Sequence, residues 1–213
     1  MMEELRHSSV ELPNMNNLLR NIPPIILASS SPRRKQLLEL IDLPFTLKTS
    51  AVIEDFNLKL KPINFAKHYA QLKARTVAQQ HPNSLIIGAD TIVVLDNEII
   101  GKPKNLDQAR STLNRLAGRT HEVITAITLI FAYKSLEVSF FEKTKVTLQN
   151  LTDNQIEYYI KNYNPLDKAG SYGIQDWFAV CIKKIDGCYY NVMGFPLSNF
   201  YQHLIKLSEE ITQ

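Results

Sequence analysis

The chain has 213 residues, of which 45% are hydrophobic and 21% charged, values typical of a globular protein that exclude general disorder and a coiled coil. The 24 Lys and Arg residues barely outnumber the 21 Asp and Glu residues. This net charge of +3 argues against a dedicated nucleic-acid-binding surface but leaves room for a local basic pocket. Residues 1–24 lack a signal-like apolar run, and we expect a flexible extension there. No apolar stretch of membrane-spanning length occurs, so we expect a soluble, cytoplasmic protein.

The hydrophobic pattern predicts alternating strands and helices in the first half of the chain. A short buried strand at 25–28 leads into a helix that has Ser31 at its N-cap and Pro32 at its first position, and that ends near residue 43. A longer helix is expected over 62–80. Strands follow at 85–88 and 91–95, and a turn at 96–97 leads into a short strand at 98–100.

In the second half, the pattern predicts a helix over 105–117, strands over 123–130 and 143–148, and a helix from Thr152 to Lys161 that opens with a capping box. The Asp186-Gly187 pair predicts a hairpin between strands at 178–185 and 188–192, and Pro196 starts the last helix. Strands, helices and hairpins interleave, so we expect an α/β fold with a mixed, twisted sheet flanked by helices. No linker divides residues 25–213, which predicts one domain with two lobes around a central cleft.

The first candidate site is the serine- and arginine-rich segment at 29–34, where the first strand meets its helix. Unpaired backbone N–H groups and the positive end of the helix dipole favour an anion at such a position. Arg33 and Arg34 add forked donors that match phosphate oxygens, and Ser29 and Ser31 add hydroxyls. The alternative is a capped surface helix with two solvated arginines.

The second and third candidates lie close together in the sequence. Asp90 interrupts an apolar run, and a buried unpaired carboxylate costs several kcal/mol, so we expect it to face a cation, a metal or a cleft. The alternative is a carboxylate satisfied by backbone N–H groups at a turn. Lys102 follows the predicted turn and precedes Pro103. Taken alone, it is an exposed lysine on a turn.

The fourth candidate is the segment at 167–175, which carries two glycines, Lys168 and Gln175. Glycines let a loop approach a ligand closely, and a carboxamide offers the donor and acceptor that complement the edge of a base. An ordinary loop is the alternative. The five histidines are scattered, which argues against a zinc site, and Cys181 and Cys188 suggest free thiols in or near the core rather than a disulfide.

Seven short stretches, taken in order, resemble the Maf family of nucleoside triphosphate pyrophosphatases. They are LASSSPRR at 27–34, IGADT at 87–91, GKP at 101–103, GRTH at 118–121, DKAG at 167–170, YGIQ at 172–175 and YNVMGFPL at 190–197. The resemblance spans residues 25 to about 204. It implies a Maf/ITPase-like fold and hydrolysis of the α–β phosphate bond of a nucleoside triphosphate, with Mg²⁺ or Mn²⁺ as cofactor. It also implies a homodimer.

The resemblance also implies roles for individual residues. Asp90 corresponds to the acid that accepts a proton from water, and Glu54 to an acid that would hold the metal. The cations expected to bind phosphate, together with Ser29, are Arg33, Arg34, Lys73, Lys102 and Lys168. The branch of the family that acts on dTTP and UTP has Arg, Thr and Gln at three marker positions, which are occupied here by Arg33, Thr91 and Gln175. We therefore expect pyrimidine triphosphates as substrates, with CTP or modified pyrimidine nucleotides as further candidates, and a role in cleaning the nucleotide pool.

Two positions depart from the family pattern. Asn164 stands where the family usually has Glu, and Asp176 follows Gln175 where the family prefers Gly. Both changes bear on the rank order of substrates. One alternative is a pyrophosphatase for 7-methyl-GTP or another modified triphosphate. Another is a nucleotide-binding regulator of cell division that hydrolyses nothing, against which the carboxylate of Asp90 argues. We expect neither nucleic acid nor a membrane as partner.

Overall fold

The computed structural model of the protein describes residue 20 and residues 22–212, so most of the expected extension at 1–24 lies outside the described residues. Seven strands form one mixed sheet in the order β2-β1-β3-β5-β6-β7, with β4 paired to β3. β1 runs parallel to β2 and β3, and the remaining pairs are antiparallel. The strands are β1 (Ile25–Leu27), β2 (Thr46–Leu47), β3 (Leu85–Leu95), β4 (Glu98–Ile100), β5 (Thr120–Phe131), β6 (Leu136–Leu148) and β7 (Ile182–Asp186).

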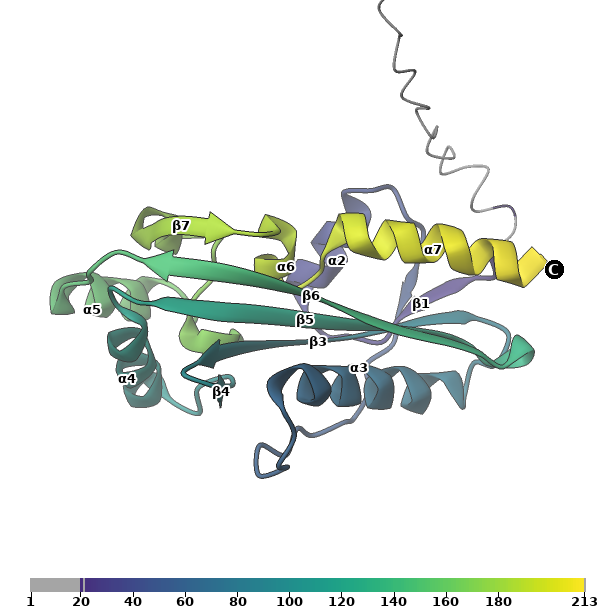
Figure 1. Ribbon diagram of the computed structural model, residues 1–213, viewed down its shortest axis with the longest axis horizontal. Helices are drawn as coiled ribbons and strands as arrows, with labels where there is room; N and C mark the ends of the chain where they lie inside the picture. Colours follow the sequence, from purple (N-terminus) through teal and green to yellow (C-terminus); the bar gives the residue numbers. More distant parts are fainter. Residues whose placement is uncertain (1–19, 21, 213) are drawn as a thin grey trace, which may run out of the picture.

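Helices flank this sheet, which confirms the predicted fold class. In Figure 1, α3 covers one face, α2 and α7 lie over the other, and α4 and α5 gather at one end of the long strands. Among the described residues, no helix combines the length and apolarity that crossing a bilayer requires. The helices are α2 (Pro32–Glu39), α3 (Pro62–Ala78), α4 (Leu106–Leu116), α5 (Asp153–Asn162), α6 (Tyr189–Met193) and α7 (Leu197–Thr212), with 3-10 turns η1 (Ala132–Lys134), η2 (Ala169–Ser171) and η3 (Trp177–Cys181).

The core is divided between the two ends of the sheet. One hydrophobic cluster joins α2 and α7 to β1 and to the adjoining parts of β3 and β5, and α3 packs on the opposite face of the sheet. Another joins α4, α5 and η3 to the far ends of β3, β5 and β6. β3 and β5 run through both clusters, so the backbone of the sheet fixes the two ends relative to each other.

Gly88 in β3 brings α3 close to the sheet. A Cβ at this position would lie 2.3 Å from the carbonyl oxygen of Ala70 and 2.7 Å from the Cβ of Ala74. Only a residue without a side chain allows this approach, and Ala70 and Ala74 supply the small surface on the helix. The close packing places Lys73, the neighbour of Ala74, over Asp90, which lies two residues beyond Gly88 on β3.

The prediction of a hairpin at 186–187 is wrong. Residues 177–181 form η3, which begins where the Asp176 carboxylate accepts a hydrogen bond from the Phe178 N–H at 3.0 Å. β7 pairs with β6 instead, and residues 189–193 are the helix α6. The buried Asn191 amide explains this departure, because it donates to the Val123 carbonyl and the Thr144 hydroxyl and so ties the segment to β5 and β6 as a helix.

Other predictions needed smaller corrections. The strands expected at 85–88 and 91–95 are one continuous strand, β3, because Asp90 finds a partner within the fold and does not interrupt the ladder. Helix α2 ends at Glu39, earlier than the predicted end near residue 43, and Leu40 directly after it is 60% exposed. The Ser31 position is the N-cap as predicted, although its hydroxyl makes no capping hydrogen bond. Cys181 and Cys188 are free thiols.

Candidate active site

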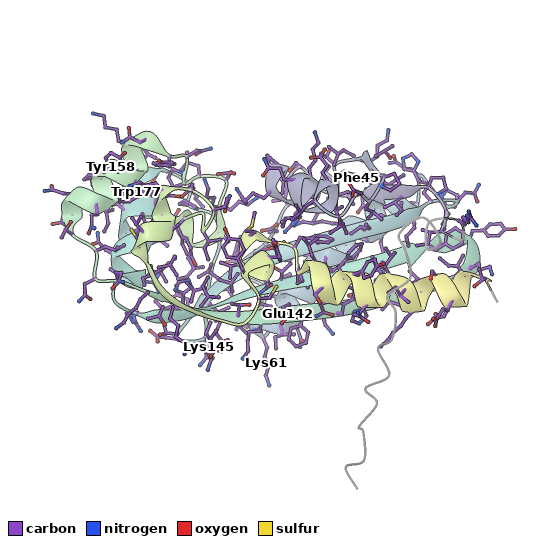
Figure 2. All side chains as sticks on the ribbon, turned by 90° about the horizontal axis from the view of Figure 1, so that it is seen from above. Phe45, Lys61, Glu142, Lys145, Tyr158 and Trp177 are labelled. Carbon is purple, nitrogen blue, oxygen red and sulfur yellow. The ribbon has the colours of Figure 1, made fainter. Side chains whose placement is uncertain are left out.

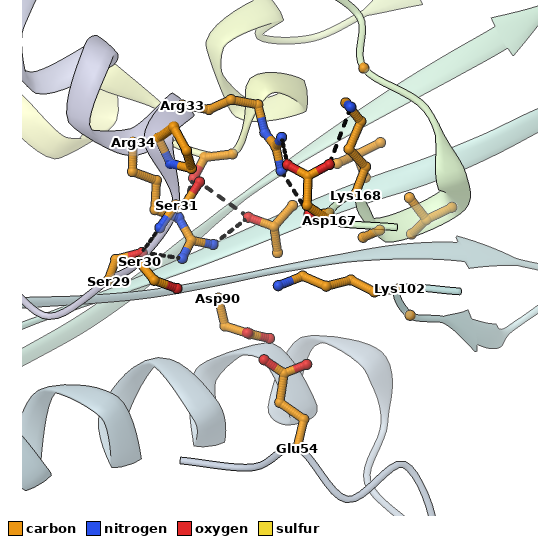
Figure 3. A pocket seen from close by; sticks show the side chains of 18 of the residues that line it. Ser29, Ser30, Ser31, Arg33, Arg34, Glu54, Asp90, Lys102, Asp167 and Lys168 are labelled. Atoms are coloured by element: carbon orange, nitrogen blue, oxygen red, sulfur yellow. Dashed lines mark hydrogen bonds and ion pairs between the residues drawn. The ribbon is translucent and has the colours of Figure 1, made fainter. Parts of the chain in front are cut away.

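A cavity of about 230 Å³ lies between the start of α2, the middle of β3 and the loop that carries η2. Five cations and three carboxylates line it, a surplus of two positive charges out of the net +3 of the whole chain. Such concentration of positive charge favours an anionic ligand. The site residues expected from the sequence all line the cavity: Ser29, Arg33, Arg34, Glu54, Lys73, Asp90, Thr91, Lys102, Lys168 and Gln175. Figure 3 labels seven of them, namely Ser29, Arg33, Arg34, Glu54, Asp90, Lys102 and Lys168.

Two carboxylates and a lysine form the deep part of the cavity. The Lys73 ammonium donates to Asp90 Oδ1 at 2.6 Å and to Glu54 Oε1 at 2.7 Å. The Asp90 side chain is only 3% exposed, and its Oδ2 atom has no hydrogen-bond partner among the described residues. The expectation that Asp90 faces a cation is therefore confirmed, and one of its oxygens is buried without a hydrogen-bond partner among the described residues.

The surroundings push the acidities of these carboxylates in opposite directions. Burial raises the pKa of Asp90, and the neighbouring Lys73 counteracts only part of this effect. Burial also acts to raise the pKa of Glu54, but the attraction and hydrogen bond of Lys73 outweigh it and leave that pKa below its usual value. Two carboxylates whose pKa values are shifted in opposite directions are typical of sites where one acid takes up a proton and the other stays ionised.

Arg34 is a fixed positive charge beneath the serine-rich turn. Its guanidinium donates to the carbonyls of Gly194 and Ala89, both at 3.0 Å, and to the Ser29 hydroxyl at 3.1 Å. It also donates to Thr91 Oγ1 at 2.9 Å. Burial lowers the pKa of Arg34, with Asp90 as the main opposing charge. Because these donors are committed to the protein, Arg34 offers a ligand mainly its charge, while Thr91 serves to hold Arg34 in place.

The rim of the cavity carries a chain of alternating charges. Arg33 donates to Asp167 Oδ2 at 2.7 Å and to the Asp167 carbonyl at 3.0 Å, as Figure 3 shows. The Lys168 ammonium lies 3.2 Å from the other carboxylate oxygen of Asp167 and donates to the Asn164 carbonyl. These ion pairs join α2 to the loop between α5 and η2.

Lys102 extends into the cavity from the segment after β4 (Figure 3). Within the described part of the chain, its ammonium makes no hydrogen bond or ion pair, and burial lowers its pKa. Gln175 is exposed and lines the cavity, and its carboxamide likewise has no hydrogen-bond partner among the described residues. These two side chains therefore keep all their hydrogen-bonding groups for a ligand.

Sequence reasoning missed several residues that the fold brings to the site. Asp167 lies in the DKAG motif at 167–170, yet nothing in the sequence indicated that it pairs with Arg33 across the cavity. Thr125 lies opposite Thr91 on the neighbouring strand and meets its hydroxyl at 3.0 Å. The Gly194 carbonyl reaches Arg34 from a segment 160 residues away. The register of β3 and β5 and the placement of α6 create these contacts. The local sequence pattern cannot predict them, because they join distant segments.

The residues present fit a divalent cation. The described residues contain no cluster of three or more His, Cys, Asp or Glu side chains that could hold a metal by themselves. Mg²⁺, however, commonly binds through one or two carboxylates together with phosphate oxygens of a substrate and water. Glu54, whose side chain is 23% exposed and lines the cavity, provides such a carboxylate.

Fold and site together define an α/β protein with a basic cavity built around a buried carboxylate, suited to a phosphorylated ligand. Residues 24–207 match the family model "Maf-like protein". The "dTTP/UTP pyrophosphatase" of Bacillus mycoides is 43% identical over 88% of this chain and 97% of its own length. The protein of that name in Bacillus cytotoxicus is 45% identical over 84% and 93%, and that of Lachnoclostridium phytofermentans is 42% identical over 89% and 98%.

The chain belongs to the Maf-like protein family, as its motifs indicated. Among solved structures, a HAM1 protein from Coxiella burnetii superimposes with a TM-score of 0.52, over 87% of this chain and all of its own. The two share 15% sequence identity, so this likeness concerns the fold alone. It agrees with the expected Maf/ITPase-like architecture.

Proposed function

We propose that the protein hydrolyses dTTP and UTP to the nucleoside monophosphate and pyrophosphate. The observation that carries this proposal is the buried Asp90 carboxylate, which has one free oxygen and lies at the base of a cavity with surplus positive charge. Such an arrangement suits a proton acceptor beside a polyphosphate. The names of the Maf-like relatives support the substrate, and Arg33, Thr91 and Gln175 occupy the marker positions of the dTTP/UTP branch.

In this reaction the oxygen of a water molecule bonds to the α-phosphorus, and the bond from that phosphorus to the α–β bridging oxygen breaks. The electron pair of that bond leaves with pyrophosphate. Asp90 accepts the water proton, for which the burial that raises its pKa is favourable. Lys102, Lys168 and Arg33 stabilise the charge on the phosphate chain, and Arg34 and Lys73 add a fixed positive field.

The family resemblance implies Mg²⁺ or Mn²⁺, and Glu54 would hold it together with phosphate oxygens of the substrate. A divalent cation at this place would supply charge neutralisation and orientation of the phosphate oxygens. Glu54 is suited to this role because its pKa is held below the usual value, so that it stays ionised. Lys73, which bridges both carboxylates, keeps their repulsion low when no cation is bound.

The test is pyrophosphate release by the purified protein with Mg²⁺, Mn²⁺ or EDTA, across dTTP, UTP, CTP, dATP, GTP and 7-methyl-GTP. We expect metal-dependent turnover of dTTP and UTP in preference to the others. Preferential turnover of 7-methyl-GTP would move the protein to another substrate class with the same chemistry. Nucleotide binding without release from any of them would instead favour a non-hydrolysing regulator.

The homodimer and the cytoplasmic location stay predictions. Sedimentation velocity across a range of protein concentrations tests the first, and fractionation of cells that produce the protein tests the second. Binding of labelled oligonucleotides at low salt tests the expectation that nucleic acid is no partner.

A further inference from the structure

The turn that carries Gln175 is closed by side chains outside the cavity. The Gly173 N–H donates to the Tyr159 hydroxyl at 3.0 Å, and that hydroxyl donates to Asp176 Oδ2 at 3.1 Å. The Asp176 N–H in turn points to the Gly173 carbonyl at 3.4 Å. Tyr159 and Asp176 thus complete a ring of hydrogen bonds around residues 173–176, with Gln175 at the exposed side of the turn.

Tyr159 is a rigid anchor for this ring. Its side chain is completely buried in α5, with its ring 5.4 Å from that of Tyr163 and 4.9 Å from that of Phe178. Trp177, which directly follows Asp176, packs 4.9 Å from Tyr158 on the outside of the same helix, as Figure 2 shows. The aromatic packing on both sides fixes the Tyr159 hydroxyl in position, and through it the backbone of the turn.

The Asp176 carboxylate also faces Lys168, one of the cations on the rim of the cavity. Its Oδ2 atom lies 3.8 Å from the Lys168 ammonium, while Oδ1 accepts from the Phe178 N–H and starts η3. Gly173 leaves the space between the two charges open, since a Cβ there would lie 2.7 Å from Asp176 Oδ2 and 2.8 Å from the Lys168 side chain. One carboxylate therefore touches both the turn that bears Gln175 and the ion pairs of Lys168.

Gln175 combines an unpartnered side chain with a fixed backbone, which is what a residue that distinguishes bases needs. Its carboxamide is free of partners within the described residues, whereas its backbone is held on both sides by the ring. A side chain with free donor and acceptor discriminates between bases only if its backbone is fixed, because a mobile carboxamide can adapt to any edge.

We infer that Tyr159 and Asp176 are a positioning pair that fixes the turn of Gln175 and thereby sets the preference of the cavity for one class of base. This inference rests on the proposed function. It gives Asp176, one of the two departures from the family pattern, a role in substrate choice. The pair touches no substrate itself and acts through Gln175 and Lys168.

Tyr159→Phe is the sharpest test, because it removes one hydroxyl and leaves the aromatic packing in place. The matched control is Tyr163→Phe, the same change on the stacked neighbouring ring, whose hydroxyl has no hydrogen bond within the described residues. The readout is the ratio of kcat/KM for UTP to that for GTP. The same ratio is measured for equilibrium binding of α,β-imido analogues of UTP and GTP, which does not depend on turnover.

Tyr159→Phe removes both hydrogen bonds of the hydroxyl, and we expect it to reduce the preference for UTP by about 3- to 10-fold. Tyr163→Phe should leave the preference unchanged. Asp176→Asn should reduce it by a similar factor. The double variant should lose no more than the larger single change, because the two side chains act as one unit. A thermal unfolding curve for each variant separates this effect from loss of the fold.

An unchanged base ratio in a folded Tyr159→Phe variant would overturn the inference, as would an equal loss of activity on every nucleotide. A wild-type protein without base preference in binding would overturn it as well. If the wild type binds the UTP analogue selectively but releases no pyrophosphate, the proposed function fails, and the binding ratios of the variants still decide the role of the pair.

Discussion

The deep carboxylate cluster and the charged rim of the cavity differ in their supporting elements and in the exposure of their carboxylates. Asp90 on β3 and Lys73 on α3 have side chains that are only 3% and 13% exposed, and Glu54 joins them from the loop before α3. The rim pairs of Arg33, Asp167 and Lys168 lie on a helix start and a loop, and Asp167 is 41% exposed. The buried Asp90 carboxylate lies on a regular strand, whereas the exposed Asp167 carboxylate lies on a loop, so we expect chemistry at the first and recognition at the second.

The largest effect is expected when the deep cluster loses its proton acceptor. Asp90→Asn should lower kcat by about 10²- to 10⁴-fold, the usual contribution of a general base, while nucleotide binding changes little. Asp186→Asn, which alters an exposed carboxylate at the end of β7, is the control and should retain full activity. Pyrophosphate release and a binding titration measure the two quantities. An active Asp90→Asn variant would remove Asp90 from the role of base.

Removal of the shared lysine should destabilise the fold more than removal of any surface cation. Lys73→Met leaves two carboxylates without their partner, and breaking a buried pair in this way costs about 3–5 kcal/mol. Arg75→Met on the same helix breaks an exposed pair with Glu137 and should cost at most about 1 kcal/mol. Urea denaturation compares the two variants. Equal losses would contradict the distinction between the deep cluster and the surface.

A buried histidine beneath the rim should make the protein sensitive to acid. His121 on β5 meets the Tyr172 hydroxyl at 2.7 Å, and burial lowers its pKa to about 4. The unfolded chain takes up this proton near pH 6.5, so the stability that is present above pH 6.5 is lost as the pH falls toward 4. The loss amounts to about 3 kcal/mol, because each tenfold difference in proton affinity between the folded and unfolded chain corresponds to about 1.4 kcal/mol.

Urea denaturation at pH 7.5, 5.5 and 4.5 measures this sensitivity. His121→Gln keeps a polar side chain but does not titrate, so its stability should approach or exceed that of the wild type as the pH falls. His203→Gln, on α7, is the control for a general effect of histidine removal. Parallel pH profiles of the wild type and His121→Gln would show that His121 contributes nothing to acid sensitivity.

The smallest of these effects is expected from closing the gap between α3 and β3. Gly88→Ala places a methyl group against the Ala70 carbonyl and the Ala74 side chain, and overpacking of this kind costs about 1–3 kcal/mol. A shifted α3 also moves Lys73 away from Asp90, so kcat should fall together with the melting temperature. Full activity in a destabilised variant would show that the position of Lys73 tolerates such a shift.

The sequence indicated the chemistry of the site better than it indicated the course of the chain. Asp90 could be singled out because an acid within an apolar run needs a partner. The seven motifs supplied most of the other site residues, and the wider family resemblance supplied Glu54 and Lys73. The segment at 177–193 could not be predicted in the same way. Its alternation and its Asp-Gly pair are typical of a hairpin, whereas Asn191 finds buried partners on β5 and β6 that favour a helix.

By itself, the sequence determined the α/β class, the family, and the residue types that gather at the cavity, because hydrophobic periodicity and motif order are local properties of the chain. Only the tertiary structure decided that Lys73 bridges Asp90 and Glu54, that Arg33 pairs with Asp167, and that Tyr159 holds the turn of Gln175. These contacts join residues from 14 to 134 positions apart. They depend on strand register and on how closely helices approach the sheet, which packing across the whole molecule fixes.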